Sequence, residues 1–135
     1  VSKVELKEKK DRVEDAIYAT KAALKEGIVP GGGVALLNAA QEIIPEGWGE
    51  EALLRAIRAP FYTILDNAGI DNIDEPSSGE GIDVTNGNVH AMVKHGIIDP
   101  VLVTKSALKN AVSVVTTIIS ADCIISNMRG DASSK

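Results

Sequence analysis

The segment from Arg12 to Ala40 constrains the fold more than any other part of the chain. It starts as a charged and then alanine-rich stretch, breaks at Gly27, and passes through Pro30-Gly31-Gly32-Gly33 into a second apolar stretch that begins at Val34. Successive glycines adopt backbone angles that are costly for other residues, so the chain can turn sharply there. The segment therefore predicts two helices joined by a glycine turn, with the N-terminus of the second helix able to face an anionic group.

Apolar spacing predicts further helices and a mainly α fold. The expected helices are 7–26, 34–44, 50–58, 61–68 and 100–120. Asp99 is expected to cap the last of these helices, with Pro100 in its first turn. The first helix carries an apolar stripe, and the last is expected to carry an inward-facing one. The two stripes consist of Val13, Ala16, Ile17, Thr20 and Leu24, and of Val103, Ala107, Ala111, Val114 and Ile118.

The rest of the chain predicts irregular and β structure. Residues 70–80 are rich in Asp, Asn, Pro, Ser and Gly and are expected to form a loop. Residues 81–89 alternate in polarity around Asn86-Gly87, which indicates a small hairpin with a two-residue turn. The apolar run Cys123–Ser126 predicts a short strand. Because aromatic residues make up only 3% of the chain, we expect a core of Ala, Val, Leu and Ile.

Composition excludes several classes of protein. The net charge of -5 and the lack of a basic run argue against a nucleic-acid binder. The single cysteine, Cys123, cannot form an internal disulfide, which fits a reducing compartment, and its apolar surroundings predict a buried, inert thiol. We find no signal peptide and no run of about 18 apolar residues, so no membrane span is expected. Since the chain begins at Val1, we expect it to be an excerpt of a longer protein.

Four positions are candidates for nucleotide chemistry, and each has a plainer alternative. Asp15 is suited to orienting a water near a phosphate, or is a helix-surface carboxylate beside Arg12. The glycines around Gly32 let a backbone pass close to a sugar or base, or form a simple helix-entry turn. Asp83 and Asp99 can each hydrogen-bond a nucleotide. The plainer alternative is a solvated turn residue for Asp83 and a helix cap for Asp99. The two histidines, His90 and His95, have no partnering Cys or carboxylate cluster, so no metal site is expected.

The order of these motifs resembles the C-terminal part of group I chaperonins, the GroEL type. The resemblance rests on four segments and covers nearly the whole chain. They are Lys7–Ala16, Glu26–Leu36, Gly96–Pro100 and Val103–Leu108. Such proteins are ring-shaped, ATP-driven folding machines. The resemblance implies that residues 1–27 belong to an intermediate domain and that residues 28–135 form the C-terminal half of an equatorial ATPase domain. That half is a multi-helical bundle with a small β-hairpin and a short C-terminal strand.

The resemblance also implies roles for single residues. Asp15 matches the catalytic aspartate that positions the attacking water, and Gly32 matches the glycine that lies against the nucleotide. Asp83 and Val84 match the pair near the base, and Asp99 matches the aspartate that holds the ribose. Residues 123–127 match a strand that joins a sheet shared with a neighbouring subunit. The implied cofactors are ATP and Mg²⁺, with no metal ligand in this chain.

Several features of such chaperonins are missing from this sequence. The Gly-Asp-Gly-Thr-Thr phosphate loop, the Mg²⁺-binding aspartate and the client-binding apical domain do not occur, and the C-terminal tail has no Gly-Met repeat. Residues 69–81 are shorter than usual, so a small helix is expected to be lost there. The isolated chain is therefore expected not to hydrolyse ATP.

The implied partners are ring neighbours in a homo-oligomer and, for the intact protein, unfolded polypeptides and a co-chaperonin. Neither nucleic acid nor a membrane is expected as a partner, and the implied location is the cytoplasm. The alternative is a standalone helical interaction or oligomerisation module with no nucleotide role. A third hypothesis, a free-standing nucleotide-binding domain, is the weakest because nothing in the sequence cradles phosphates.

Overall fold

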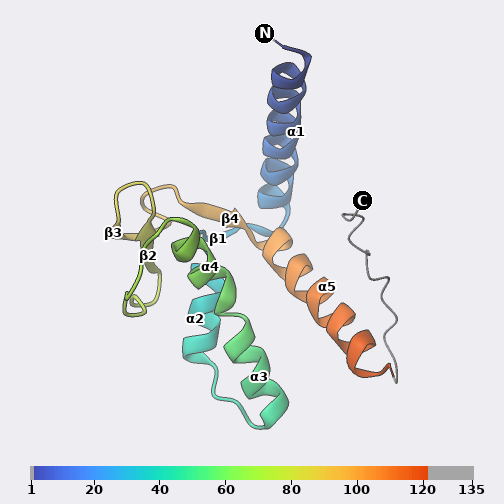
Figure 1. Cartoon of the computed structure of the whole chain (residues 1–135), viewed down its shortest axis with the longest axis vertical. Coiled ribbons are helices and arrows are strands. Elements are labelled where there is room, and N and C mark those ends of the chain that lie inside the picture. The colour runs from blue at the N-terminus through green and yellow to red at the C-terminus, as the bar shows by residue number, and fades with distance from the viewer. Residues whose placement is uncertain (1, 122–135) are drawn as a thin grey trace, which may run out of the picture. The chain divides into compact units, whose positions relative to one another are not determined.

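The computed structural model describes residues 2–121 and confirms the mainly α fold (Figure 1). The chain divides into two units, Val1–Thr104 and Lys105–Lys135, which are described separately. The elements in chain order are α1 (Lys3–Glu26), β1 (Ile28–Pro30), α2 (Val34–Glu42), α3 (Trp48–Ala56), α4 (Ala59–Asn67), β2 (Glu80–Asp83), β3 (Asn88–Ala91), β4 (Ile98–Pro100) and α5 (Val101–Ile119). The expected strand at Cys123–Ser126 lies outside the described residues.

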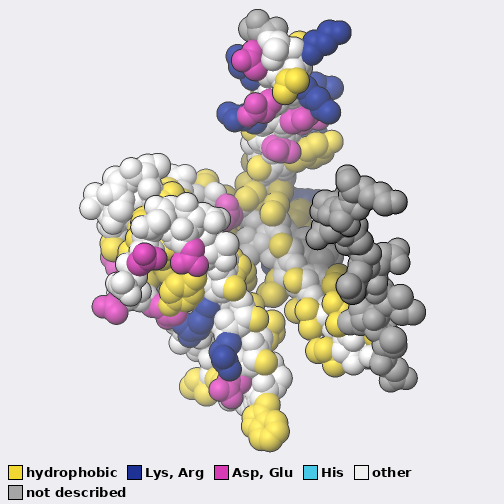
Figure 2. Space-filling view, viewed as in Figure 1, with side chains coloured by type: hydrophobic (Ala, Val, Ile, Leu, Met, Phe, Trp, Pro, Cys, Tyr) yellow, Lys and Arg dark blue, Asp and Glu magenta, His cyan; other side chains and the backbone are white. Residues whose placement is uncertain are grey.

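Helix α1 begins at Lys3, earlier than the sequence predicts, because Ser2 and Glu5 form a capping box. The Glu5 amide donates to the Ser2 hydroxyl (3.2 Å), and the Ser2 amide donates to the Glu5 carboxylate (2.8 Å). Figure 2 shows both signs of charge around the N-terminal half of α1, where Lys10 and Glu14 form an ion pair at 3.6 Å. None of the α1 side chains that the structure describes is buried.

Strands β1 and β4 form a two-stranded antiparallel ladder, with Val29 opposite Asp99. Beyond the ladder, the Gly31 amide donates to the Ile97 carbonyl (2.9 Å) and the Val101 amide donates to the Gly27 carbonyl (3.1 Å). The prediction that Asp99 caps the last helix is wrong. The backbone of Asp99 is extended within the ladder, and α5 begins only at Val101.

The core combines the two helices α2 and α4 with the β2–β3 hairpin. Its buried members are Val34, Leu37, Phe61, Leu65, Ile82 and Met92. The prediction of a core made from Ala, Val, Leu and Ile is wrong in two places, since Phe61 and Met92 are each 1% exposed. A low aromatic content limits how many rings a core holds, but it does not say where the single Phe lies.

The glycine turn packs tightly against the first turn of α4. Gly33 has φ +77°, and a Cβ on Gly33 would lie 2.6 Å from the Phe61 amide nitrogen and 2.7 Å from its Cα. Real side chains do not tolerate such distances. Gly33 is therefore required both by its backbone angle and by the approach of α4 to the start of α2.

The hairpin is confirmed, but its predicted two-residue turn at Asn86-Gly87 is wrong. Asp83 pairs with Asn88, which leaves the four residues 84–87 in the loop. The Asp83 carboxylate organises this loop by accepting from the Thr85 amide (2.9 Å) and the Thr85 hydroxyl (2.6 Å). The Gly87 amide donates to the Asp83 carbonyl at 2.8 Å. These bonds within the loop explain why it is longer than the Asn-Gly pair suggests.

The expected loop at 70–80 is confirmed as far as Gly79, and Glu75 anchors it to the helices. The Glu75 carboxylate pairs with Arg58 and accepts from the Tyr62 hydroxyl (2.9 Å) and the Gln41 amide (3.2 Å). Arg58 also donates to the Ala40 carbonyl at 3.1 Å. The hydrogen bond from Arg58 is the main reason why the pKa of Glu75 lies below its usual value.

Helix α5 buries none of its described side chains fully, so the predicted inward stripe is wrong for the described part of the chain. Val103, Val114 and Ile118 are all half-exposed or more. Figure 2 shows apolar side chains on the visible face of α5. By length and composition alone, α5 is also apolar enough to cross a membrane, although no such segment was expected from the sequence.

Substituting Gly33 tests the contact between the glycine turn and α4. We expect Gly33→Ala to lower the free energy of unfolding by about 2–5 kcal/mol, because it combines a left-handed backbone angle with a steric clash. Gly49→Ala is the matched control. Gly49 lies in α3, and nothing stands within 4 Å of the position that a Cβ would take there, so alanine should raise stability by about 0.5–1 kcal/mol. Urea unfolding measures both, and equal effects would contradict the prediction.

Substituting Glu75 tests the anchor of the 70–79 loop. We expect Glu75→Gln to lower the free energy of unfolding at pH 7 by about 1.5–3 kcal/mol, the range for hydrogen bonds to charged groups. The pKa of Glu75 is lowered in the fold, so its contribution exists above the unfolded value of about 4.3 and is lost as the pH falls through the folded value. Urea unfolding of both proteins from pH 7 to pH 3 should therefore show the difference shrinking in acid. A constant difference would contradict this account.

Candidate functional site

Gly32 stands in the glycine turn before α2, with φ +68°. Its neighbours are more enclosed, since a Cβ on Gly31 would lie 3.1 Å from the Ile98 amide nitrogen, and Gly33 packs on Phe61. A Cβ on Gly32 would meet a single atom within 4 Å, the methyl carbon of Met92 at 3.0 Å. No side chain of the described residues caps the start of α2. The turn therefore leaves polar backbone groups near Gly32 that a ligand can use.

Asp99 lies in β4, opposite Val29 in β1, so the ladder brings it close to the strand that leads into the glycine turn. Partial desolvation raises the pKa of the Asp99 carboxyl above its usual value. No side chain of residues 2–121 donates a hydrogen bond to this carboxylate, so no side chain in that part of the chain offsets its desolvation. Such a carboxylate is suited to accept hydrogen bonds from the hydroxyl groups of a ligand.

Asp83 and Val84 stand at the end of β2 and the start of the hairpin loop. The Asp83 oxygens accept from Thr85 and from the Asn86 side-chain amide (3.1 Å), and the Thr85 hydroxyl is the main cause that lowers the pKa of Asp83. These contacts fit the plainer interpretation of Asp83 as a turn residue. Val84 is 41% exposed beside it and is free to contact a flat ligand surface.

Asp15 is exposed on α1, twelve residues before Gly27. This separation corresponds to about 18 Å along the helix axis. Among the described residues, no hydrogen bond or ion pair joins Asp15 to Gly32, Asp83 or Asp99. The ladder and the core thus bring together the segments that carry the last three residues, while the role of Asp15 stays a prediction.

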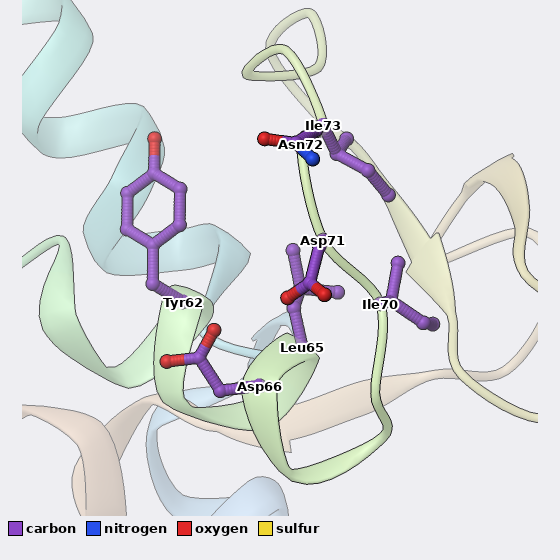
Figure 3. Close-up of a pocket in the computed structure, with 7 residues that line it drawn as sticks. All are labelled: Tyr62, Leu65, Asp66, Ile70, Asp71, Asn72 and Ile73. Atoms are coloured by element: carbon purple, nitrogen blue, oxygen red, sulfur yellow. The ribbon is translucent and has the colours of Figure 1, made fainter.

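Two hollows lie away from these residues. The one drawn in Figure 3 has a volume of about 330 Å³, and the carboxylates of Asp66 and Asp71 lie along it. Its lining is Tyr62, Leu65, Asp66, Ile70, Asp71, Asn72 and Ile73. The second, of about 410 Å³, lies between the α2–α3 connection and α3 and is lined in part by Ile43, Ile44 and Leu53. Within residues 2–121 no three His, Cys, Asp or Glu side chains gather as a metal ion requires.

Sequence reasoning missed two groups, Met92, which packs on Gly32, and the Glu75 cluster, which anchors the 70–79 loop. Met92 stands in an irregular turn after β3, so no periodic pattern marks it as buried. Glu75 is one of several acidic residues in a loop, and only the fold shows that Arg58 and Tyr62 reach it. Neither could be found from spacing, because both depend on contacts between distant segments.

Comparison with known proteins agrees with the resemblance read from the sequence. The model of the TCP-1/cpn60 chaperonin family matches residues 1–129. A crystal structure of a group III chaperonin in the open state is similar to this chain at 28% identity, with a TM-score of 0.67. The match covers 77% of this chain and 25% of that one, so this chain spans about a quarter of the length of that chaperonin chain. The narrower assignment to group I stays a prediction.

Replacing Asp99 tests whether partial burial of its charged carboxylate destabilises the fold. We expect Asp99→Asn to raise the free energy of unfolding slightly at pH 7, by about 0.5 kcal/mol at most, because the amide carries no charge to desolvate. The folded pKa of Asp99 is raised, so the cost exists above that pKa and disappears as the pH falls towards the unfolded value of about 3.9. Paired urea unfolding curves at pH 7 and pH 3 measure this. A variant less stable than the original at pH 7 would contradict it.

Proposed function

The chain belongs to the TCP-1/cpn60 chaperonin family, and on that premise we propose that it supplies the sugar-and-base side of a chaperonin ATP site. Residues 1–27 would belong to the intermediate domain and residues 28–135 to the equatorial domain. The phosphate-binding loop and the Mg²⁺ ligand would come from a segment outside this chain. The observation that carries the proposal is the β1–β4 ladder, which brings Asp99 beside the strand that leads into Gly32.

The groups around the glycine turn fit a nucleotide in their chemistry. The carboxylate of Asp99 is partly desolvated and lacks a donor among the described residues, which suits it to accept from ribose hydroxyls. A Cβ on Gly32 would meet only the Met92 methyl carbon, and Gly32 itself is partly exposed, so a sugar or base could approach its backbone from the side away from Met92. Val84 offers an apolar contact to a base. The reaction at this site would be the hydrolysis of bound Mg-ATP, with the Mg²⁺ ligand supplied from outside this chain.

Asp15 would act as the group that orients the attacking water. Its carboxylate is exposed on α1 and makes no ion pair among the described residues, so it is available for that role. Gly27 joins α1 to β1 with φ +89°, and nothing lies within 4 Å of a Cβ built there. A change of direction at Gly27 would carry Asp15 towards or away from the nucleotide. Such positioning steps often govern the turnover of ATP-driven machines.

The wider biology follows from the same proposal. Within an intact ring this segment would take part in ATP-dependent folding of other polypeptides, in contact with neighbouring subunits. A co-chaperonin and a cytoplasmic location belong to the group I assignment and are proposed with it. We propose no contact with nucleic acid or with a membrane.

A second candidate function is a helical interaction module with no nucleotide role. The observation that favours it is that helices α1 and α5 bury none of their described side chains, although both carry apolar residues. Exposed apolar surface of this extent is typical of a protein-protein interface. Light scattering combined with nucleotide titration separates the two functions, because a module of this kind would associate without responding to nucleotide.

A titration with adenosine tests the proposed function. We expect millimolar adenosine to shift the backbone amide signals of Gly32, Val84 and Asp99 in ¹⁵N-labelled full-length chain, since a partial site supports only weak binding. Asp99→Ala should remove these shifts, while Asp71→Ala, in a loop outside the site, should keep them. The chain alone should release phosphate from Mg-ATP no faster than buffer does. Absence of the amide shifts, or robust turnover that depends on Asp15, would contradict the proposal.

A further inference from the structure

We infer that Met92 is a positioning residue that holds the three nucleotide-contacting segments of the proposed site in one arrangement. These segments are the glycine turn with Gly32, the hairpin with Asp83 and Val84, and strand β4 with Asp99. The inference rests on the proposed function, because it concerns the residues assigned there. Met92 itself is buried, with 1% of its surface exposed, so it acts through these segments and not on the nucleotide.

The side chain of Met92 lies between two glycines from different segments. A Cβ on Gly32 would be 3.0 Å from the Met92 methyl carbon, and a Cβ on Gly81 would be 2.9 Å from both Cγ and the sulfur of Met92. Gly81 precedes Asp83 by two residues in β2. One side chain therefore packs directly on the turn that carries Gly32 and on the strand that carries Asp83.

The backbone of Met92 extends the link to the third segment. Its carbonyl accepts from the Ile97 amide at 2.9 Å, and its amide donates to the Gly79 carbonyl at 3.1 Å. The Ile97 carbonyl in turn accepts from the Gly31 amide at 2.9 Å. The contacts thus form a closed circuit from the glycine turn through Met92 and Ile97 back to the glycine turn. Asp99 follows Ile97 by two residues and is placed by the same circuit.

Methionine suits this position for a physical reason. Its unbranched, flexible thioether chain fills an irregular gap between two backbones, which a β-branched or aromatic side chain would fit less well. Truncation to alanine would leave a cavity that touches both Gly32 and Gly81, so each segment would gain freedom to shift. Leucine has a similar volume and should preserve most of the contact.

A nuclear magnetic resonance experiment observes the link directly. The full chain contains two methionines, Met92 and Met128, so ¹³C-methyl labelling gives two signals, which a Met128→Leu variant assigns. We expect adenosine to shift the Met92 methyl signal with the same concentration dependence as the Gly32 amide. If the Gly32 amide shifts while the Met92 methyl signal stays in place, the inference is overturned and the proposed function stands.

A matched pair of variants separates positioning from loss of stability. Leu37 is as buried as Met92, but it supplies none of the nearest contacts of Gly32 or Gly81. Under conditions where both variants remain folded, we expect Met92→Ala to weaken adenosine binding about tenfold or more, and Leu37→Ala to change it by less than about threefold. Met92→Leu should restore binding. Equal losses in the two alanine variants would show a structural role only and would overturn the inference.

Amide hydrogen exchange tests the link without any nucleotide. We expect Met92→Ala to speed exchange of the Gly31 amide, which bonds to Ile97, more than it speeds exchange of the Ala68 amide at the end of α4. Leu37→Ala should not show this preference. If adenosine fails to bind but the exchange preference is present, the nucleotide proposal fails while the mechanical link is supported. If the exchange of both amides rises equally, the link itself is refuted.

Discussion

The pairing of β1 with β4 is the constraint on which the rest of the first unit depends. These short strands join residues far apart in the sequence, and Val29 lies opposite Asp99. The chain between the two strands, from the glycine turn to the hairpin, must form a closed loop before this pairing can form. Closing such a long loop costs conformational entropy, and two short strands recover little of it. The buried contacts of Leu37, Phe61 and Met92 supply the stabilisation that a two-stranded ladder cannot.

Local patterns in the sequence predict the helices and the glycine turn because the causes are local. The run of glycines after Pro30 fixes where the chain turns, and Gly27 fixes where α1 ends. Hairpin formation follows from alternation and a Gly-containing turn, although the length of the turn depends on which groups the Asp83 carboxylate accepts from. The expectation for Asp99 failed because Asp-Pro before a helix has two uses. The ladder with Val29 decides between them, and it comes from the other end of the unit.

The candidate site was foreseeable only in part, for a related reason. Gly32 and Asp99 could be named because they lie in contiguous motifs that resemble a chaperonin, and Asp83 could be named because the resemblance extends over most of the chain. The connection between them could not be named, because Met92 and Gly81 meet only in the folded chain. The buried position of Met92 has no signature in spacing, and the Glu75 anchor depends on Arg58 reaching a loop beyond α4. The prediction of an inward-facing apolar stripe on α5 failed for a different reason. An apolar helix face can be covered by a neighbouring protein segment that does not belong to the same chain.

The proposed role of Asp15 adds a geometric requirement to this picture. A helix is stiff over the twelve residues that separate Asp15 from Gly27, so the carboxylate stays about 18 Å along the axis from that joint. It can meet a ligand at the glycine turn only for certain directions of α1 relative to β1. Those directions are set by the backbone of Gly27, whose carbonyl accepts from the Val101 amide at 3.1 Å. The residue that ends α1 thus also bonds to the first residue of α5. A reorientation of α1 at Gly27 must therefore either preserve the hydrogen bond between Gly27 and Val101 or pay the cost of breaking it.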